Sequence, residues 1–600
     1  MLSGDQIRVL DLLPSFQGDE PALVRCETRI VSLADKPQYE ALSYVWGGPI
    51  PRSYITVSGC EVDITSSLYA ILCRLRLGGE CKRTLWIDQL CINQQDPEEK
   101  TSQVRLMRRI YKSCTTCLLW MGDIREDIAV SGPEAALDFF RYLAAVNQAA
   151  DPDALLIPES MRSRANFETM MVALRSIMAA QGGWWTRVWT VQEAILPTNS
   201  TLVWGPLSIP WHVLTKATEA WKNGLPSSSH ELNPGSFPDF SRIMARMIWL
   251  DNCKGLKDSP LHTIIRYRER EATDGHDKIY ALLGLLPVGA LPETEKCNYQ
   301  RTVARTYCLA TIELILNEKS LSPLTIDPWL EDEQATEEMP RWALDLSQVS
   351  KYDRSWEHIH RYPIYNANGS RELDLETLRE TLRETIRLQE SSASPKLPLS
   401  GHAVDTIALV GECLQEDDLD NTLMVMKSWK SLTENFHRTN NFQSPAHYPG
   451  GSRGTVDAFC RTMLGDLVHG WDNFPKYWAT DFEANKVLQF LESGTPQYWR
   501  EQVPGSSDGI LTTVEAQVVH RAFFITKTGL LGLGHPKTAC GDQVWVFDGG
   551  RVPFTIRSKK NSASHPSDYD FVGRCYVQGI MKGELFKDVD HIETQIANLF

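Results

Sequence analysis

Two short apolar segments, followed by a strong helix start, most constrain how the first third of this 600-residue chain can fold. "TLWIDQLCI" (Thr84–Ile92) and "TCLLW" (Thr116–Trp120) are nearly continuous apolar runs, typical of strands buried on both faces of a parallel sheet. Between them, Asp96 is a favourable N-cap residue and Pro97 suits the first position of a helix. The alternation of strand and helix predicts an α/β domain built on a parallel sheet.

A chain of 600 residues is expected to form more than one folded region, because single hydrophobic cores stop growing at roughly 250–300 residues. The sequence patterns predict where these regions lie. Residues 1–38 are predicted to form a strand pair that packs on the α/β domain, which spans 39–205. Residues 206–510 are predicted to be mainly helical, with turn-rich acidic segments such as Glu331–Glu338. Residues 511–600 have alternating strand patterns and are predicted to form a β-rich module.

Charge and cysteine spacing exclude several classes of function. The formal net charge of −15 disfavours nucleic acid as a partner, since neutralising phosphates needs clustered Lys and Arg. The 14 cysteines have irregular spacing, and Cys114 and Cys117 lack a second pair at zinc spacing, so neither a metal site nor a resident cofactor is predicted. The longest apolar run, Ile279–Leu291, is too short to span a membrane and contains Pro287. Without a secretory signal, the expected location is cytoplasmic.

Polar side chains gather where the predicted strands end, in "YEALSYVWGG" and "LWIDQLCINQ". Strands of a parallel sheet end at one common edge, and ligands of α/β proteins bind there. The candidate ligand-binding residues in these two segments are Ser43, Tyr44, Trp46, Gly47, Asp88, Asn93 and Gln94. The alternative interpretation is that Asp88 and Asn93 cap turns and that the tryptophans belong to the core.

Glu193 is the candidate catalytic residue. It follows Trp189 by four positions in "RVWTVQEAI", so a helix here would place both side chains on one face. A glutamate beside tryptophans at the mouth of a cleft has its pKa tuned by partial burial. Trp189 is therefore included among the binding candidates. The alternative is that Glu193 forms an ordinary ion pair with Arg187 or another basic group.

The order of three segments, "YEALSYVWG", "LWIDQLCINQ" and "RVWTVQE", closely resembles the heterokaryon incompatibility (HET) domain of filamentous fungi. Later segments also resemble full-length HET proteins, among them "RYREREATDGHDKIYALLGLL" and "GDQVWVFDGGRVPFTIR". The resemblance implies a role in non-self recognition that ends in programmed cell death. It also implies protein partners, including the products of incompatible alleles.

HET domains are distantly similar to TIR domains, which implies a flavodoxin-like, three-layer fold for residues 39–205. Several TIR domains cleave NAD with a glutamate that lies four residues after a tryptophan, the spacing of Trp189 and Glu193. The resemblance therefore implies NAD as a substrate and Glu193 as the catalytic residue, although Thr190 stands where the TIR pattern has cysteine. It also implies self-assembly through this domain. A non-catalytic adaptor that recruits the death machinery remains the alternative.

Overall fold

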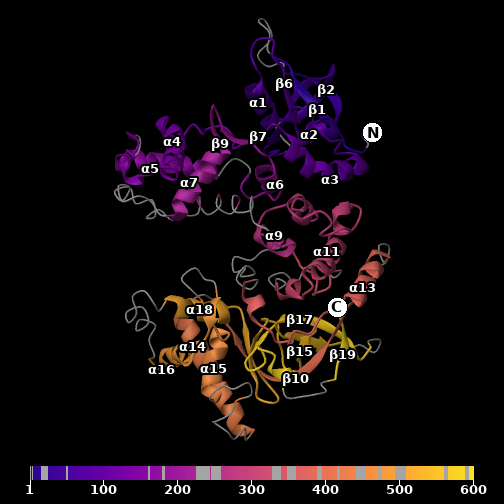
Figure 1. Ribbon diagram of the computed structural model, residues 1–600, viewed down its shortest axis with the longest axis vertical. Coiled ribbons are helices and arrows are strands. Elements are labelled where there is room, and N and C mark those ends of the chain that lie inside the picture. Colours follow the sequence, from indigo (N-terminus) through magenta and orange to yellow (C-terminus); the bar gives the residue numbers. More distant parts are fainter. Residues whose placement is uncertain are drawn as a thin grey trace. The chain divides into compact units, whose positions relative to one another are not determined.

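The chain forms two compact units in a computed structural model (Figure 1). One consists of Met1–Asp258, Glu269–Pro287 and Glu295–Gln300, and the other of Ser259–Arg268, Val288–Thr294 and Arg301–Phe600. The four-part division of the sequence stays a prediction. The residues that the structure describes are 2, 4–14, 24–48, 52–159, 162–178, 183–223, 244, 247, 250, 258–326, 339–347, 360–387, 395–414, 419–440, 448, 454–469, 475–493, 508–559, 565–587 and 593–600. The acidic segment Glu331–Glu338 lies outside them.

A mixed sheet organises the first unit. Its described strands have the order β5-β4-β2-β1-β6-β3-β7-β8-β9. The bounds are β1 Gln6–Leu12, β2 Arg25–Ser32, β3 Glu40–Ser43, β4 Arg52–Val57, β5 Cys60–Thr65, β6 Arg83–Trp86, β7 Thr116–Trp120, β8 Ser200–Trp204 and β9 Leu207–Pro210. The run β6-β3-β7-β8 is parallel, as predicted, whereas β1 pairs antiparallel with both β2 and β6, and β8 pairs antiparallel with β9. The predicted parallel sheet is therefore found in this central run, and antiparallel pairs on both sides extend it into a mixed sheet.

The direction of the chain connections reverses at β3. From β3 the chain goes to β6 on one side, and from β6 it crosses to β7 on the other side of β3. Because these strands are parallel, their carboxyl ends share one edge of the sheet. A crevice that can hold a ligand is expected outside that edge, at the point of reversal.

The helix that follows β6 begins as its sequence predicts. Asp96 caps α3 (Pro97–Ser113), and its carboxylate accepts hydrogen bonds from the amides of Glu98 and Glu99. The preceding strand is shorter than predicted. It ends at Trp86, and residues Asp88–Cys91 form the short helix α2. The apolar run alone did not show this change, because short buried strands and short buried helices have the same composition.

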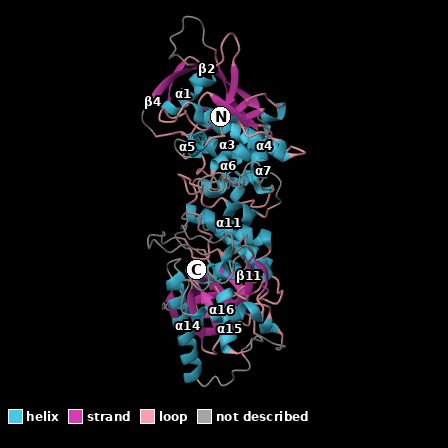
Figure 2. Cartoon of the chain, turned by 90° about the vertical axis from the view of Figure 1, so that its left-hand side faces the viewer, coloured by secondary structure: helices cyan, strands magenta, loops and turns pink. Residues whose placement is uncertain are grey.

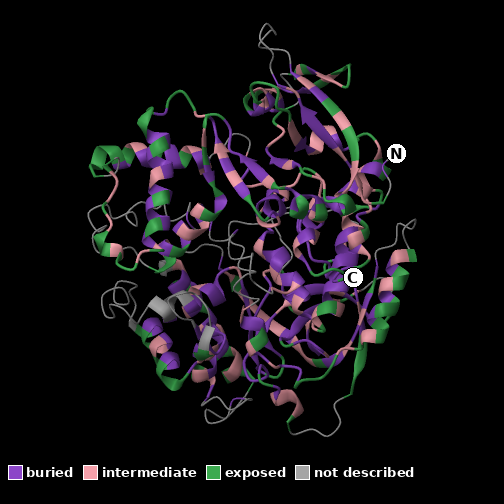
Figure 3. Ribbon diagram, turned by 45° about the horizontal axis from the view of Figure 1, so that its top comes forward, coloured by how far each residue is buried: buried purple, intermediate pink, exposed green. Residues whose placement is uncertain are grey.

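Helices complete the first unit. Helix α1 (Ser66–Leu75) packs on β5 and on β4, and β4 lies beside it in Figure 2. Helix α4 (Ser131–Val146) packs on α5 (Arg164–Met178) and on α7 (Trp211–Asn223). The facing sides of these helices are buried, as the purple segments of Figure 3 show.

A later part of the chain returns to the first unit and is here named the return segment (Glu269–Pro287 and Glu295–Gln300). It contains the one-turn helix α10 (Asp277–Tyr280). Arg108 of α3 donates from Nη1 to the carbonyl of Leu286 at 2.8 Å, and the amide of Val188 donates to the carbonyl of Glu271 at 2.9 Å. The return segment thus packs on α3 and on the chain just before α6 (Trp189–Ile195).

A barrel-like sheet forms the core of the second unit. Its described strands have the order β15-β16-β17-β19-β10-β13-β14-β18, and β10 also pairs with β15, which closes a ring of five strands. The bounds are β10 Leu397–Cys413, β13 Ala522–Thr526, β14 Leu531–Gly534, β15 Gln543–Phe547, β16 Phe554–Ser558, β17 Asp568–Arg574, β18 Tyr576–Val577 and β19 Gln595–Leu599.

Strand β10 was missed in the sequence, because it lies within the region predicted to be mainly helical. It pairs successively with β19, β15 and β13 along its length and so holds the sheet together. The other described elements of the unit include α9 (Pro260–Arg266), α11 (Val303–Glu318), α13 (Leu375–Arg387), α14 (Leu419–Thr439), α15 (Thr455–Leu464), β11 (Leu467–His469), β12 (Pro475–Trp478), α16 (Asp481–Ser493) and α18 (Asp508–Val518).

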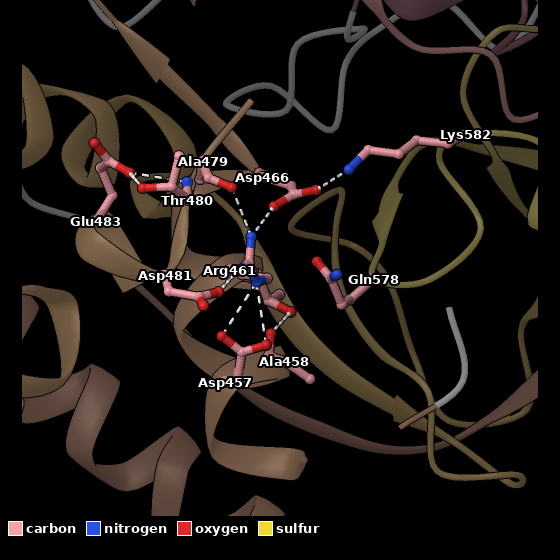
Figure 4. A network of polar contacts seen from close by, with 12 residues as sticks. Asp457, Ala458, Arg461, Asp466, Ala479, Thr480, Asp481, Glu483, Gln578 and Lys582 are labelled. Atoms are coloured by element: carbon pink, nitrogen blue, oxygen red, sulfur yellow. Dashed lines mark hydrogen bonds and ion pairs between the residues drawn. The ribbon is translucent and has the colours of Figure 1, made fainter. Parts of the chain in front are cut away.

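A polar network around Arg461 connects several of these elements (Figure 4). The guanidinium of Arg461, on α15, pairs with Asp457 on the same helix, with Asp466 before β11 and with Asp481 at the start of α16. Asp466 also pairs with Lys582 at 2.6 Å. One planar side chain with several donors therefore ties α15 to the residue before β11 and to the start of α16.

Candidate functional site

The carboxyl end of β3 lies directly against α6. The hydroxyl of Ser43, the last residue of β3, donates a hydrogen bond to the carboxylate of Glu193 on α6. The same hydroxyl accepts a hydrogen bond from the indole Nε1 of Trp184 at 2.8 Å. Ser43 is 1% exposed and Glu193 is 5% exposed, so this chain of hydrogen bonds is shielded from water.

Burial raises the pKa of Glu193 to about 7. Loss of hydration is the largest cause, because the charged form cannot keep its water shell in the interior. The positive charge of Arg187 and hydrogen bonding by Ser43 and Tyr111 act in the opposite direction without cancelling the shift. A carboxyl group with this pKa is partly protonated at neutral pH and can both accept and release a proton.

A second carboxylate, Asp88, begins α2 two residues after the end of β6, on the same edge of the sheet. It accepts a hydrogen bond from the indole Nε1 of Trp46 at 2.8 Å and one from the amide of Gln89 at 2.8 Å. The side chain of Gln94 donates to the carbonyl of Asp88 at 3.0 Å. Burial is the largest influence on Asp88 and raises its pKa.

A cavity of about 660 Å³ opens at this edge. Its walls include Trp46, Gly47, Asp88, Gln94, Trp189 and Glu193. Gly47 has a φ of 77°, in the left-handed region that favours glycine, and this lets the chain turn sharply beside the cavity. The volume is within the range of pockets that hold small-molecule ligands and cofactors.

The return segment supplies a further wall. Asp277 accepts hydrogen bonds from the indole Nε1 of Trp189 at 2.8 Å and from the hydroxyl of Tyr299 at 2.7 Å. Burial raises the pKa of Asp277. The ammonium group of Lys100, on α3, lies 4.1 Å from the centre of the Tyr299 ring.

The structure brings most of the predicted site residues together, and their functional roles remain predictions. Six of them line the cavity, and Ser43 contacts Glu193. Tyr44 is buried instead, its hydroxyl donates to Gln89 at 2.8 Å, and its carbonyl accepts from Arg187 at 2.8 Å. The side chain of Asn93 is exposed and accepts from the amide of Gln95 at 3.2 Å, which is the turn-capping role of the alternative interpretation.

Several residues that line the cavity were not among the predicted ones. Those with charged or phenolic side chains are Lys100, Arg187, Glu271, Asp274, Asp277 and Tyr299. The sequence held one signal for part of this set, because Asp274 and Asp277 belong to "DGHDKIY", one of the segments that resemble full-length HET proteins. The alternative interpretation of the sequence pairs Arg187 with Glu193. It donates to the carbonyl of Tyr44, and its charge still lowers the pKa of Glu193.

The described part of the chain has neither a cluster of metal ligands nor a helix suited to a membrane. There, no group of three or more His, Cys, Asp or Glu side chains is arranged to hold a metal ion. No helix among the described residues combines the length and the apolar character needed to cross a membrane.

Comparisons with known proteins match both ends of the chain. Residues 39–193 match the family "Heterokaryon incompatibility protein (HET)", and residues 506–594 match the "Het-6 beta-barrel domain". The chain is 23% identical to "Heterokaryon incompatibility protein 6, OR allele" of Neurospora crassa, over 96% of this chain and 94% of that protein. No solved structure matches the chain. The first match spans the segment from before β3 to Glu193, and the return segment lies beyond it.

Proposed function

We propose that this chain, which belongs to the fungal heterokaryon incompatibility (HET) proteins, serves non-self recognition by hydrolysing NAD in the cavity of its first unit. Loss of NAD would then cause the programmed cell death that stops an incompatible fusion. The partners in this proposal are products of incompatible alleles, and assembly through the HET domain would switch on the activity.

The observation that carries the proposal is the state of Glu193. It is buried at the carboxyl edge of a parallel run of strands, lines a cavity of about 660 Å³ and has a pKa raised to about 7. Perturbed carboxyl groups of this kind in a cavity are candidates for acid–base and charge-stabilising roles.

The chemistry follows from that position. The bond between C1′ of the ribose and the ring nitrogen breaks, and nicotinamide leaves as a neutral molecule with the bonding electron pair. The ribose is left with oxocarbenium-like positive charge, which a nearby carboxylate stabilises more strongly than it stabilises the intact substrate. Water then forms the new bond to C1′, and Glu193 accepts the proton that water releases. With its raised pKa, Glu193 returns this proton to solvent near neutral pH.

The cavity wall also has side chains that suit the phosphates and the bases of a dinucleotide. Lys100 and Arg187 are basic side chains of the wall and can bind phosphate oxygens. Trp46, Trp189 and Tyr299 offer aromatic faces to a base.

The test is an assay of the purified full-length chain for loss of NAD and release of nicotinamide, at several protein concentrations that include forced assembly. Glu193→Gln keeps the size of the side chain and removes its charge, and we expect it to lower turnover at least about 100-fold. Glu134→Gln is the matched control, because Glu134 is exposed on α4 and pairs with Arg141. Equal turnover by the wild type and Glu193→Gln would exclude the catalytic role.

One observation favours the alternative, a non-catalytic adaptor. Glu193 is only 5% exposed and its carboxylate already accepts a hydrogen bond from Ser43, as expected of a residue that stabilises the domain. An adaptor would still kill the host cell when Glu193→Gln is expressed, without loss of NAD. Scoring cell death and NAD together for the two proteins therefore separates the two functions.

A further inference from the structure

Two tryptophans of the cavity wall are held in the same way. The indole N–H of Trp46 donates to Asp88, and that of Trp189 donates to Asp277, each at 2.8 Å. A hydrogen bond to a carboxylate fixes the orientation of the ring. It also draws electron density toward the face of the indole, which is the aromatic face that binds cations best.

The charged side chains of the cavity wall also favour a cation. Five acidic side chains and two basic ones line the cavity. The acidic ones are Asp88, Glu193, Glu271, Asp274 and Asp277. Both basic side chains already have electron-rich neighbours, since Lys100 lies over the ring of Tyr299 and Arg187 donates to the carbonyl of Tyr44. Acidic side chains therefore outnumber basic ones in the cavity wall, beside flat aromatic surfaces.

We infer that this cavity selects a planar, positively charged heterocycle and holds it against Trp189, with Asp277 as the residue that determines the selectivity. The inference rests on the proposed function. The nicotinamide ring carries a positive charge only in the oxidised dinucleotide, so the cavity would take the oxidised form and reject the reduced one. Asp277 lies outside residues 39–193, and the selectivity is therefore assigned to the return segment.

Selectivity for charge is tested by binding, separately from hydrolysis. The probes are 1-methylnicotinamide, which is a planar cation without a glycosidic bond, and nicotinamide, which is neutral. Their affinities for the full-length chain are measured by titration calorimetry. We expect the wild type to bind the cation about tenfold more tightly than the neutral ring, as a desolvated cation–aromatic contact beside a carboxylate allows.

Three variants test whether Asp277 causes the preference for the cation. Asp277→Asn keeps the shape of the side chain and is expected to reduce the preference to about twofold or less. Tyr299→Phe keeps the ring but removes one of the two hydrogen bonds to Asp277. We expect its preference for the cation to lie between those of the wild type and Asp277→Asn. This variant still tests the inference if Asp277→Asn does not fold. Asp123→Asn is the matched control, because Asp123 is half exposed and pairs with Arg74 in the same unit.

Equal affinity of the wild type for the two probes, no binding of either, or an unchanged preference in Asp277→Asn would overturn the inference. The NAD assay separates this failure from a failure of the proposed function. A chain that prefers the cation but leaves NAD intact contradicts hydrolysis alone. A chain that hydrolyses NAD without preferring the cation contradicts the selectivity alone.

Discussion

The hydroxyl of Ser43 donates a hydrogen bond to the carboxylate of Glu193, across 150 positions of sequence. It connects the end of a central strand with a short helix and joins the first and last of the three characteristic segments. The same hydroxyl accepts from Trp184, so Ser43 positions both an aromatic ring and the candidate catalytic group.

Ser43→Ala removes this hydrogen-bond donor to Glu193 and leaves the indole N–H of Trp184 buried without its acceptor. We expect the pKa of Glu193 to rise further, because the bond from Ser43 lowers it. We also expect a loss of about 1–3 kcal/mol in the free energy of unfolding. Urea unfolding measures the stability, and infrared titration of the carboxyl group measures the pKa. Ser208→Ala, at an exposed position of β9, is the control and should change neither quantity.

The buried carboxyl group of Glu193 predicts a pH-dependent stability. Its pKa is about 7 in the folded chain, against 4.5 for an unperturbed glutamate, so the folded state binds the proton more tightly than the unfolded state. The stabilisation is complete below about pH 4.5 and is lost as the pH rises through 7, by on the order of 3 kcal/mol. Glu193→Gln lacks this group, so its stability should fall less between pH 5 and 8. Parallel curves for the two proteins in urea unfolding would contradict the raised pKa.

In the second unit, Arg461→Ala should be strongly destabilising. The substitution removes the guanidinium that pairs with both Asp457 and Asp466. Asp466 is only 4% exposed. We expect a loss of about 2 kcal/mol in the unfolding free energy, because the buried Asp466 keeps Lys582 as a cation but loses its charge-assisted hydrogen bond from Arg461. Arg461→Lys retains the charge but not the planar fork and should recover only part of the loss. Arg383→Ala on α13, which removes an exposed pair with Glu380, is the control, and an equal effect of both Ala variants would contradict the prediction.

The cap of α3 offers a smaller, local test. Asp96→Ala removes the acceptor for the amides of Glu98 and Glu99 and should cost about 1 kcal/mol of unfolding free energy. Asp96→Asn keeps an acceptor and should cost less. Because α3 carries Lys100 into the cavity wall, hydrogen exchange at the first turn of α3 measures whether the loss is local. Unchanged exchange in Asp96→Ala would contradict a capping role.

Much of the fold around the site could be predicted from local patterns. The buried strand at Thr116–Trp120, the start of α3 at Pro97 and the shared face of Trp189 and Glu193 follow from apolar runs, capping residues and helical spacing. The pairing of β1 with β6 and the role of β10 could not be predicted, because strand partners are chosen by tertiary packing across long sequence separations.

The sequence by itself determined the resemblance to HET proteins and the set of polar residues at the strand ends, since these depend on residue type and short spacing. Only the tertiary structure decided which of them meet. It brought Ser43 to Glu193, left Asn93 on a turn and added Asp277 and Tyr299 from the return segment. The physical reason is that a buried carboxyl group is tuned by every group packed around it, and those neighbours come from distant parts of the chain.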